Sequence, residues 1–101
     1  MLVTRWQAPI VPDRQQIKMM FEAEGLDPYE EVFPAQSEVG DHRHAFDEVR
    51  MVCSGELLVN IAGNKLLLRA GDKIKIPANT RHSTKTDGTS PCVSLYAQKI
   101  F

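Results

Sequence analysis

The spacing of apolar positions along this chain changes near residue 31, and the change predicts two kinds of structure. Before it, Ile17, Met20 and Phe21 recur at helical spacing. After it, apolar and polar residues alternate in short runs that are separated by turns containing glycine or proline. We therefore expect one amphipathic helix near residues 13–24, followed by a set of short strands.

The predicted helix carries signals at both ends. Asp13 and Gln16 have the spacing of a capping box, in which each side chain bonds the backbone N–H of the other residue. Gly25 is suited to a left-handed residue just past the helix, so that Leu26 can contact Phe21 in a Schellman motif. We expect the apolar stripe of this helix to pack against the core or against a second subunit.

Strand periodicity is clearest in the second half of the chain, where apolar side chains recur at every second position. The predicted strands lie at residues 48–54, 57–61, 66–68, 73–76 and 92–98. The dipeptide Gly63-Asn64 has the composition of a two-residue hairpin turn between the second and third of them. Many short strands with regular turns are typical of a β-sandwich or a β-barrel.

The composition is that of one globular domain, with 101 residues, 43% hydrophobic residues and a net charge of −1. Because phosphate binding needs a dense Lys/Arg surface, this charge argues against nucleic acid as a partner. The chain has no apolar run of membrane-spanning length and no secretory segment at its start, so we expect a cytoplasmic protein with no membrane partner. Cys53 and Cys92 lack CxxC spacing and are predicted to be free thiols.

All three histidines fall in one pattern with a glutamate. His42 and His44 are two apart, Glu48 follows four residues later, and His82 lies in a later strand region. Residues two apart on a strand share a face, so extended backbone would turn His42 and His44 the same way. Three imidazoles and one carboxylate suit a divalent ion of Fe, Mn, Zn or Ni. A lone His-x-His is explained more simply by two solvated surface histidines. The downstream sequence therefore decides whether these residues indicate a metal site.

That downstream sequence makes the chain resemble the cupin superfamily over about residues 36–101. The first cupin motif is HxH, three residues, Glu, six residues and Gly, and it runs here from His42 to Gly55. The second is Gly, five residues, Pro-x-Gly, two residues, His, three residues and Asn. It runs here from Gly71 to His82 with the proline in place.

Three positions depart from these motifs. Gln36 stands where a glycine is expected six residues before the first histidine, and Asn79 replaces the glycine of Pro-x-Gly. Thr86 stands in place of the final asparagine. Asparagine is the next most tolerant residue for a left-handed backbone, so the turn at Asn79 can survive. None of the three is a metal-ligand position of the family.

The resemblance implies an all-β fold, a small antiparallel jelly-roll β-barrel with one short N-terminal α-helix. Residues 1–35 would form an N-terminal extension and residues 36–101 the cupin-like barrel. Because single-domain cupins are often homodimers, the resemblance also implies self-association. The helix and Trp6 are the candidates for that contact.

For the site, the resemblance implies one divalent metal ion inside a mouth of the barrel. Its ligands would be His42, His44, Glu48 and His82, with Glu48 also a candidate catalytic proton acceptor. Four protein ligands on a metal that prefers six leave two positions for water or substrate. This arrangement is more typical of catalysis than of structural zinc.

Alternation from Glu48 places Arg50 on the same inner face, where a buried guanidinium needs a partner. A carboxylate or phosphate of a small ligand is one candidate partner. The alternatives are a bulge that turns Arg50 outward, or pairing with Asp47 or a carboxylate of the chain's end. Tyr96 and Gln98 are further candidates for ligand binding if the last strand has the matching phase.

Three functions are compatible with these residues. The first is a metal-dependent enzyme of the dioxygenase, isomerase or decarboxylase type, acting on a small acidic or diol-like molecule. The second is a non-catalytic cupin that binds or senses a small molecule, which is disfavoured here because no DNA-binding segment accompanies the barrel. The third is a structural role with an empty site. The complete set of ligand-type residues makes this structural role the least favoured of the three, and the enzyme is favoured over the sensor.

Overall fold

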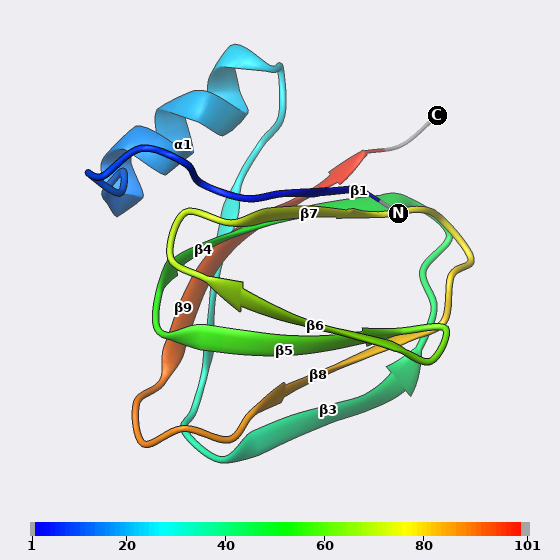
Figure 1. Cartoon of the computed structure of the whole chain (residues 1–101). Helices are drawn as coiled ribbons and strands as arrows, with labels where there is room; N and C mark the ends of the chain where they lie inside the picture. Colours follow the sequence, from blue (N-terminus) through cyan, green and yellow to red (C-terminus); the bar gives the residue numbers. More distant parts are fainter. Residues whose placement is uncertain (1, 100–101) are drawn as a thin grey trace.

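The computed structural model describes residues 2–99, in which nine strands and one helix form a two-layer β-sandwich of jelly-roll type (Figure 1). The predicted all-β class and N-terminal helix are confirmed. The elements are β1 Leu2–Thr4, α1 Arg14–Ala23, β2 Tyr29–Phe33, β3 Ser37–His42, β4 Asp47–Ser54, β5 Glu56–Ile61, β6 Asn64–Arg69, β7 Lys73–Ile76, β8 His82–Thr86 and β9 Cys92–Lys99.

The two sheets are antiparallel and hydrogen-bond separately. One sheet has the order β1-β7-β4-β9-β2 and the other has the order β3-β8-β5-β6. The layers are joined by a common core of inward side chains rather than by a continuous hydrogen-bonded ring. This core contains Phe33, Val52, Leu57, Val59, Ile61, Leu68, Ile74, Ile76 and Cys92.

The part of the chain before residue 36 contributes two strands to the five-stranded sheet. Strand β1 pairs with β7, and β2 pairs with β9 over five residues from Tyr29 to Phe33. The sequence analysis placed neither strand, because β1 has only three residues and β2 carries two adjacent glutamates. The division into an extension and a barrel at residue 36 stays a prediction, although strands from both sides of it share one sheet.

Helix α1 has the predicted signals at both ends. Gln16 N–H donates to the carboxylate of Asp13, and the Gln16 side chain accepts from Asp13 N–H, both at 2.9 Å. At the other end Leu26 N–H donates to the Phe21 carbonyl at 3.0 Å, while Gly25 has φ of +77°. These contacts confirm the capping box and the Schellman motif.

The helix covers the outer face of the five-stranded sheet (Figure 1). Ile17 and Phe21 are buried there against β4 and β9, whereas Met20 of the predicted stripe is 40% exposed. Strand β4 is therefore buried on both faces, with Val49 under the helix and its alternate residues turned into the sandwich. Because the helix packs on its own sheet, its role in a subunit contact stays a prediction.

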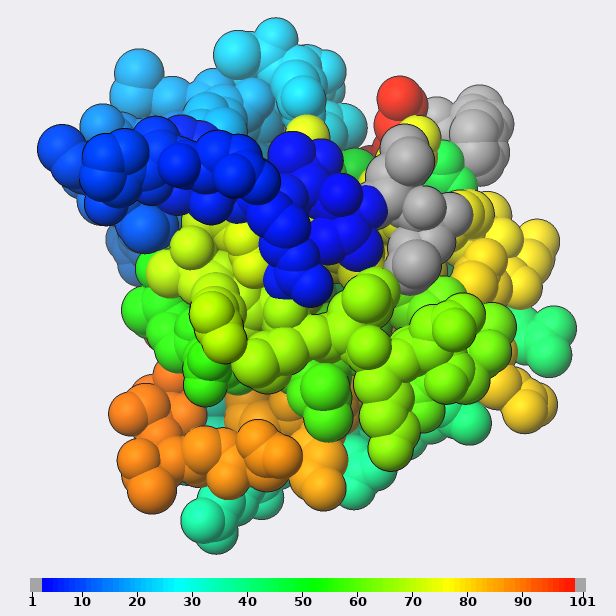
Figure 2. All heavy atoms as spheres, viewed as in Figure 1, coloured from blue at the N-terminus to red at the C-terminus, as the bar shows by residue number. Residues whose placement is uncertain are grey.

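The N-terminal segment lies along the β6–β7 turn, as the blue atoms in Figure 2 show. Trp6 packs over Gly71, where an added Cβ would approach the Trp6 Cβ to 2.7 Å, so the motif glycine leaves room for the indole. Asp72 accepts Trp6 N–H at 3.0 Å and pairs with Arg5 at 2.8 Å. Burial alone would raise the pKa of Asp72, yet these bonds and the Arg69 N–H hold it below its usual value.

The β5–β6 hairpin turns at Ala62-Gly63, so the predicted turn at Gly63-Asn64 was wrong. Ile61 pairs with Asn64, and Ala62 and Gly63 have φ of +49° and +88°, as a type I′ turn requires. The two registers differ by two residues and place the same side chains on each face. Alternation of apolar residues therefore could not separate them.

Replacing Ala62 with asparagine should stabilise the protein by about 1 kcal/mol. Alanine in a left-handed conformation costs roughly 1–2 kcal/mol, much of which asparagine avoids. The urea midpoint should rise with an unchanged slope. Ala8→Asn is the control, because Ala8 is exposed and outside the positive-φ residues. An equal or lower midpoint for Ala62→Asn would contradict the strain at this turn.

Candidate metal centre

A β-bulge in β3 turns His42 toward the interior. Val39 pairs with Thr84 and His42 pairs with His82, so β3 has one extra residue between the two pairs. Uninterrupted alternation from the inward Val39 would have placed Asp41 inside and His42 outside. The bulge reverses the phase, and nothing in the hydrophobic pattern marks its position.

His44 comes from the loop between β3 and β4, not from the extended strand that the sequence predicted. Its imidazole stacks on the ring of Phe46 with 4.7 Å between centroids and 10° between planes. This contact fixes the direction of the ring. Phe46 therefore serves as packing behind a candidate ligand.

The loop that leads to His82 is fastened to the loop that carries His44. Asn79 N–H donates to the His44 carbonyl at 2.6 Å, and Ala78 N–H donates to the carboxylate of Asp47 at 2.8 Å. Asn79 has φ of +59°, so the left-handed turn predicted at this departure from the motif is present. These two hydrogen bonds fix the positions of His44 and His82 relative to each other.

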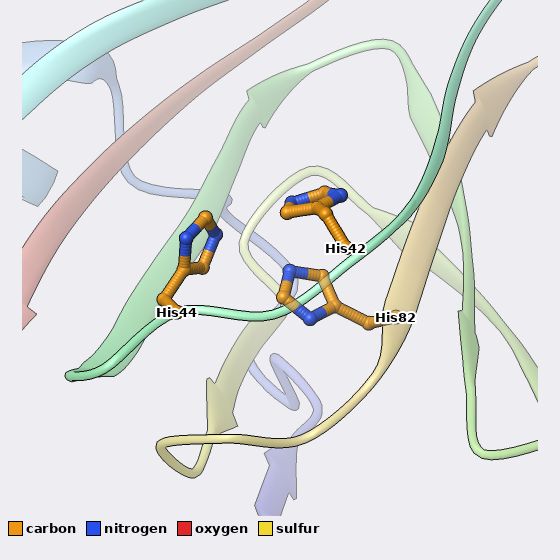
Figure 3. A group of neighbouring side chains, drawn as sticks. All are labelled: His42, His44 and His82. Atoms are coloured by element: carbon orange, nitrogen blue, oxygen red, sulfur yellow. The ribbon is translucent and has the colours of Figure 1, made fainter.

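The three imidazoles turn toward one point inside the sandwich (Figure 3). One nitrogen from each of His42, His44 and His82 lies within 4.8 Å of the other two. His82 is buried and the other two rings are half-buried. These three residues lie close enough to hold one metal ion, as the sequence predicted for them.

Backbone carbonyls fix the protonation of two of these rings. Nδ1 of His42 lies 2.8 Å from the Gly40 carbonyl, and Nδ1 of His82 lies 2.9 Å from the Thr80 carbonyl. Since a carbonyl only accepts, each Nδ1 carries the proton and each Nε2 is left with a free lone pair. A histidine that binds a metal is usually held in this way, so the donor set fits a divalent ion.

Glu48 lies beside the three histidines rather than within their group. Its Oε1 is 3.5 Å from Nε2 of His44, and its Oε2 accepts a hydrogen bond from Nε of Arg50 at 3.0 Å. Burial lowers the pKa of His44, an effect that the charge of Glu48 opposes and the neighbouring histidines reinforce. The shift favours the neutral imidazole, which is the form that binds metals.

Arg50 points into the sandwich, as alternation from Glu48 predicted. Its guanidinium lies over the rings of Tyr96 and Phe33, at 4.7 and 5.2 Å from their centroids. Nη1 donates to Ser94 Oγ at 2.7 Å. The guanidinium thus has two aromatic neighbours and a hydroxyl partner.

The carboxylates that pair Arg50 differ from those expected. Asp47 does not pair it and instead bonds the β7–β8 loop. The pairing groups are Glu48 and Glu31, the latter with Oε1 at 2.8 Å from Nη2. Glu31 was not among the candidates from the sequence. The signal that could have identified it is its spacing of two residues from Phe33 in the YEEVF segment, which places both side chains on one face of the strand.

These side chains surround a cavity of about 190 Å³ that opens between the sheets. Tyr96 and Gln98 line this cavity, so β9 turns both side chains toward it, as their candidate role in ligand binding requires. Their role in binding a ligand stays a prediction. The lining consists of Glu31, Phe33, Val39, His42, His44, Phe46, Glu48, Arg50, His82, Thr84, Tyr96 and Gln98.

Solved structures with the same fold include an enzyme. DMSP lyase DddQ from Ruegeria pomeroyi DSS-3 is 25% identical, with a TM-score of 0.68 over 74% of this chain and 38% of its own. A cupin superfamily protein from Desulfitobacterium hafniense DCB-2 is 15% identical, with a TM-score of 0.66 over 99% of this chain and 77% of its own. A cupin protein from Bacteroides fragilis is 21% identical, with a TM-score of 0.65 over 95% and 84%.

This chain spans 38% of the length of the DMSP lyases that it resembles. A search of curated proteins gives no significant match. Among the described residues, α1 is neither long nor apolar enough to cross a membrane. The family model described as "Cupin domain" matches residues 29–97, which include the candidate metal centre, strands β2 to β8 and most of β9. The chain belongs to the cupin family.

Proposed function

We propose that this chain binds one divalent metal ion through His42, His44 and His82 and is a metal-dependent enzyme acting on a small acidic molecule. The observation that carries the proposal is the pair of Nδ1–H contacts to backbone carbonyls, which leaves Nε2 lone pairs beside a common point. A solvated surface histidine has no need of a fixed tautomer. Fe, Mn, Zn and Ni all suit imidazole ligands.

Glu48 is proposed as the fourth ligand and as the proton acceptor. Its position supports both roles, because Oε1 lies 3.5 Å from Nε2 of His44, beside the group of three histidines. When bound, the metal would polarise an oxygen of the substrate and lower its proton affinity. Arg50 holds the other oxygen of Glu48 and so limits its rotation.

Dioxygenase, isomerase and decarboxylase reactions are the candidates for this site, and the similarity to DMSP lyases adds lyase activity. Tyr96 and Gln98 are proposed to contact the substrate, since both are in the cavity wall. The cavity of about 190 Å³ restricts the substrate to a small molecule.

One contact favours a second candidate, a non-catalytic cupin that binds or senses a small molecule. Glu48, the only proposed proton acceptor, is already hydrogen-bonded to Arg50 in the buried interior. A binding site has no need of a free base, whereas an enzyme with this residue as base must loosen the contact. Turnover separates the two candidates.

Protein purified without added metal should contain, or take up, one divalent ion per chain. Elemental analysis and calorimetric titration with Zn²⁺, Mn²⁺, Fe²⁺ and Ni²⁺ would measure it. The loaded protein is then assayed with and without air on hydroxy acids, keto acids, oxalate and DMSP. Turnover supports the enzyme, and saturable binding without turnover supports the sensor. Binding well below one ion per chain would contradict the metal site and the metal-dependent enzyme.

A homodimer and a cytoplasmic location remain inferences from the family resemblance and from the composition. Light scattering on the purified protein tests the first of them. A mass of one chain at micromolar concentration would exclude a stable dimer.

A further inference from the structure

Arg50 and Glu31 form an ion pair whose two sides differ in exposure. The Arg50 side chain is 6% exposed, whereas that of Glu31 is 43% exposed on the edge strand β2. Nε and Nη1 of Arg50 donate to the buried partners Glu48 and Ser94. Nη2 is therefore the nitrogen that meets a carboxylate in contact with solvent.

The formal charges of the residues that line the cavity do not sum to zero, either without a metal ion or with one. Two carboxylates, Glu31 and Glu48, and one guanidinium, Arg50, leave one negative charge in excess when the histidines are neutral. A divalent cation reverses this to one positive charge in excess. When Glu31 also turns into solvent, the excess becomes two positive charges, and because uncompensated buried charge is costly, the loaded site favours an anionic ligand.

Glu31 is the replaceable partner. Its carboxylate is already half in water, so it gains solvation when it turns outward. The buried guanidinium keeps Glu48 as a partner, and an incoming carboxylate can take the place of Glu31. A carboxylate that enters from the cavity side would meet a guanidinium that is itself buried and lies over the rings of Phe33 and Tyr96. Charge-assisted hydrogen bonds are stronger in such surroundings.

We propose that Glu31 occupies the place of a substrate carboxylate, and that a small molecule bearing a carboxylate displaces it from Nη2 of Arg50. The proposal rests on the metal site proposed above. Glu48 shows how far apart the guanidinium and the histidines lie. One of its carboxylate oxygens accepts a hydrogen bond from Arg50, and the other lies 3.5 Å from Nε2 of His44. A molecule of about three carbons can thus place a carboxylate on Arg50 and a second oxygen toward the histidines.

Lactate tests this exchange, with its uncharged amide, lactamide, as the matched probe. Zn²⁺-loaded protein is titrated with each by calorimetry after one ion per chain has been confirmed. Glu31→Gln should raise the affinity for lactate by about tenfold, because it removes the competing carboxylate. It should leave the affinity for lactamide within about twofold.

Glu30→Gln is the matched control. Glu30 is the neighbouring residue of β2 and pairs with Arg14 on the outer side of the sheet at 2.6 Å. The substitution removes the same charge without touching the cavity, so lactate affinity should not change. Arg50→Lys keeps the charge but loses the planar donor edge, and it should weaken lactate binding by about tenfold.

Equal gains for the Glu31 and Glu30 variants would overturn the exchange, since they would reflect net charge alone. An unchanged or lower lactate affinity in Glu31→Gln would overturn it as well. So would lactate binding too weak to measure in every variant. Any of these results with one Zn²⁺ per chain leaves the proposed metal site standing, whereas failure to take up Zn²⁺ contradicts the metal site itself.

Discussion

His82→Ala should abolish stoichiometric metal binding, lowering the affinity for Zn²⁺ at least about 100-fold. His82 is the most buried of the three histidines, and its Nδ1 is fixed by the Thr80 carbonyl. Loss of even an outer partner of a ligand costs about 10–100-fold, so loss of the ligand itself should cost more. Calorimetric titration and elemental analysis measure the effect.

Two further variants separate loss of the ligand from loss of the fold. His44→Ala changes a half-buried loop residue and should also abolish binding, while circular dichroism shows an intact β-sheet. Gln98→Ala is the control, because it removes an exposed side chain of the same cavity wall that has no ring nitrogen. Retention of one tightly bound ion by either histidine variant would show that the three rings do not form the site.

Gly55→Ala should destabilise the protein by about 3 kcal/mol or more, a large part of the 5–15 kcal/mol typical of a domain. Gly55 has φ of +76°, and an added Cβ would overlap the Pro91 carbonyl oxygen and lie 3.0 Å from Cα of Cys92. Both neighbours are backbone at the start of β9, so neither can move without shifting that strand. The urea midpoint, or the yield of folded protein, reports the loss.

Gly63→Ala separates the cost of the positive φ from the cost of the steric overlap. Gly63 also has a positive φ, of +88°, but an added Cβ would meet nothing within 4 Å. Its substitution should cost about 1 kcal/mol, from the backbone conformation alone. A similar cost at both glycines would mean that the overlap with Pro91 is relieved without loss.

Local signals were enough to predict the parts of this fold that depend on neighbouring residues. The caps of α1 and the inward direction of Arg50 followed from spacings of two to five residues. The three histidines were found by motif spacing, and their rings do meet. The turn at Ala62 was missed because two registers bury the same side chains.

The remaining features depend on pairings between distant segments. Glu31 reaches Arg50 only because β2 pairs with β9, and its own segment carries no signal for that partner. The position of Arg50 on an inner face predicts that it needs a counter-charge, but it does not indicate which acidic residue supplies it. Gln36 keeps a left-handed backbone, with φ of +55°, where the family motif has glycine, so the residue type concealed the conformation.

The bulge in β3 has a consequence for how this site could be lost over evolutionary time. His42 faces inward because of the number of residues between it and Val39, not because of their identity. A single-residue deletion there would leave every letter of the histidine motif intact and still rotate one ligand into the solvent. Descendants of this domain could therefore keep an unaltered motif after their metal chemistry has gone.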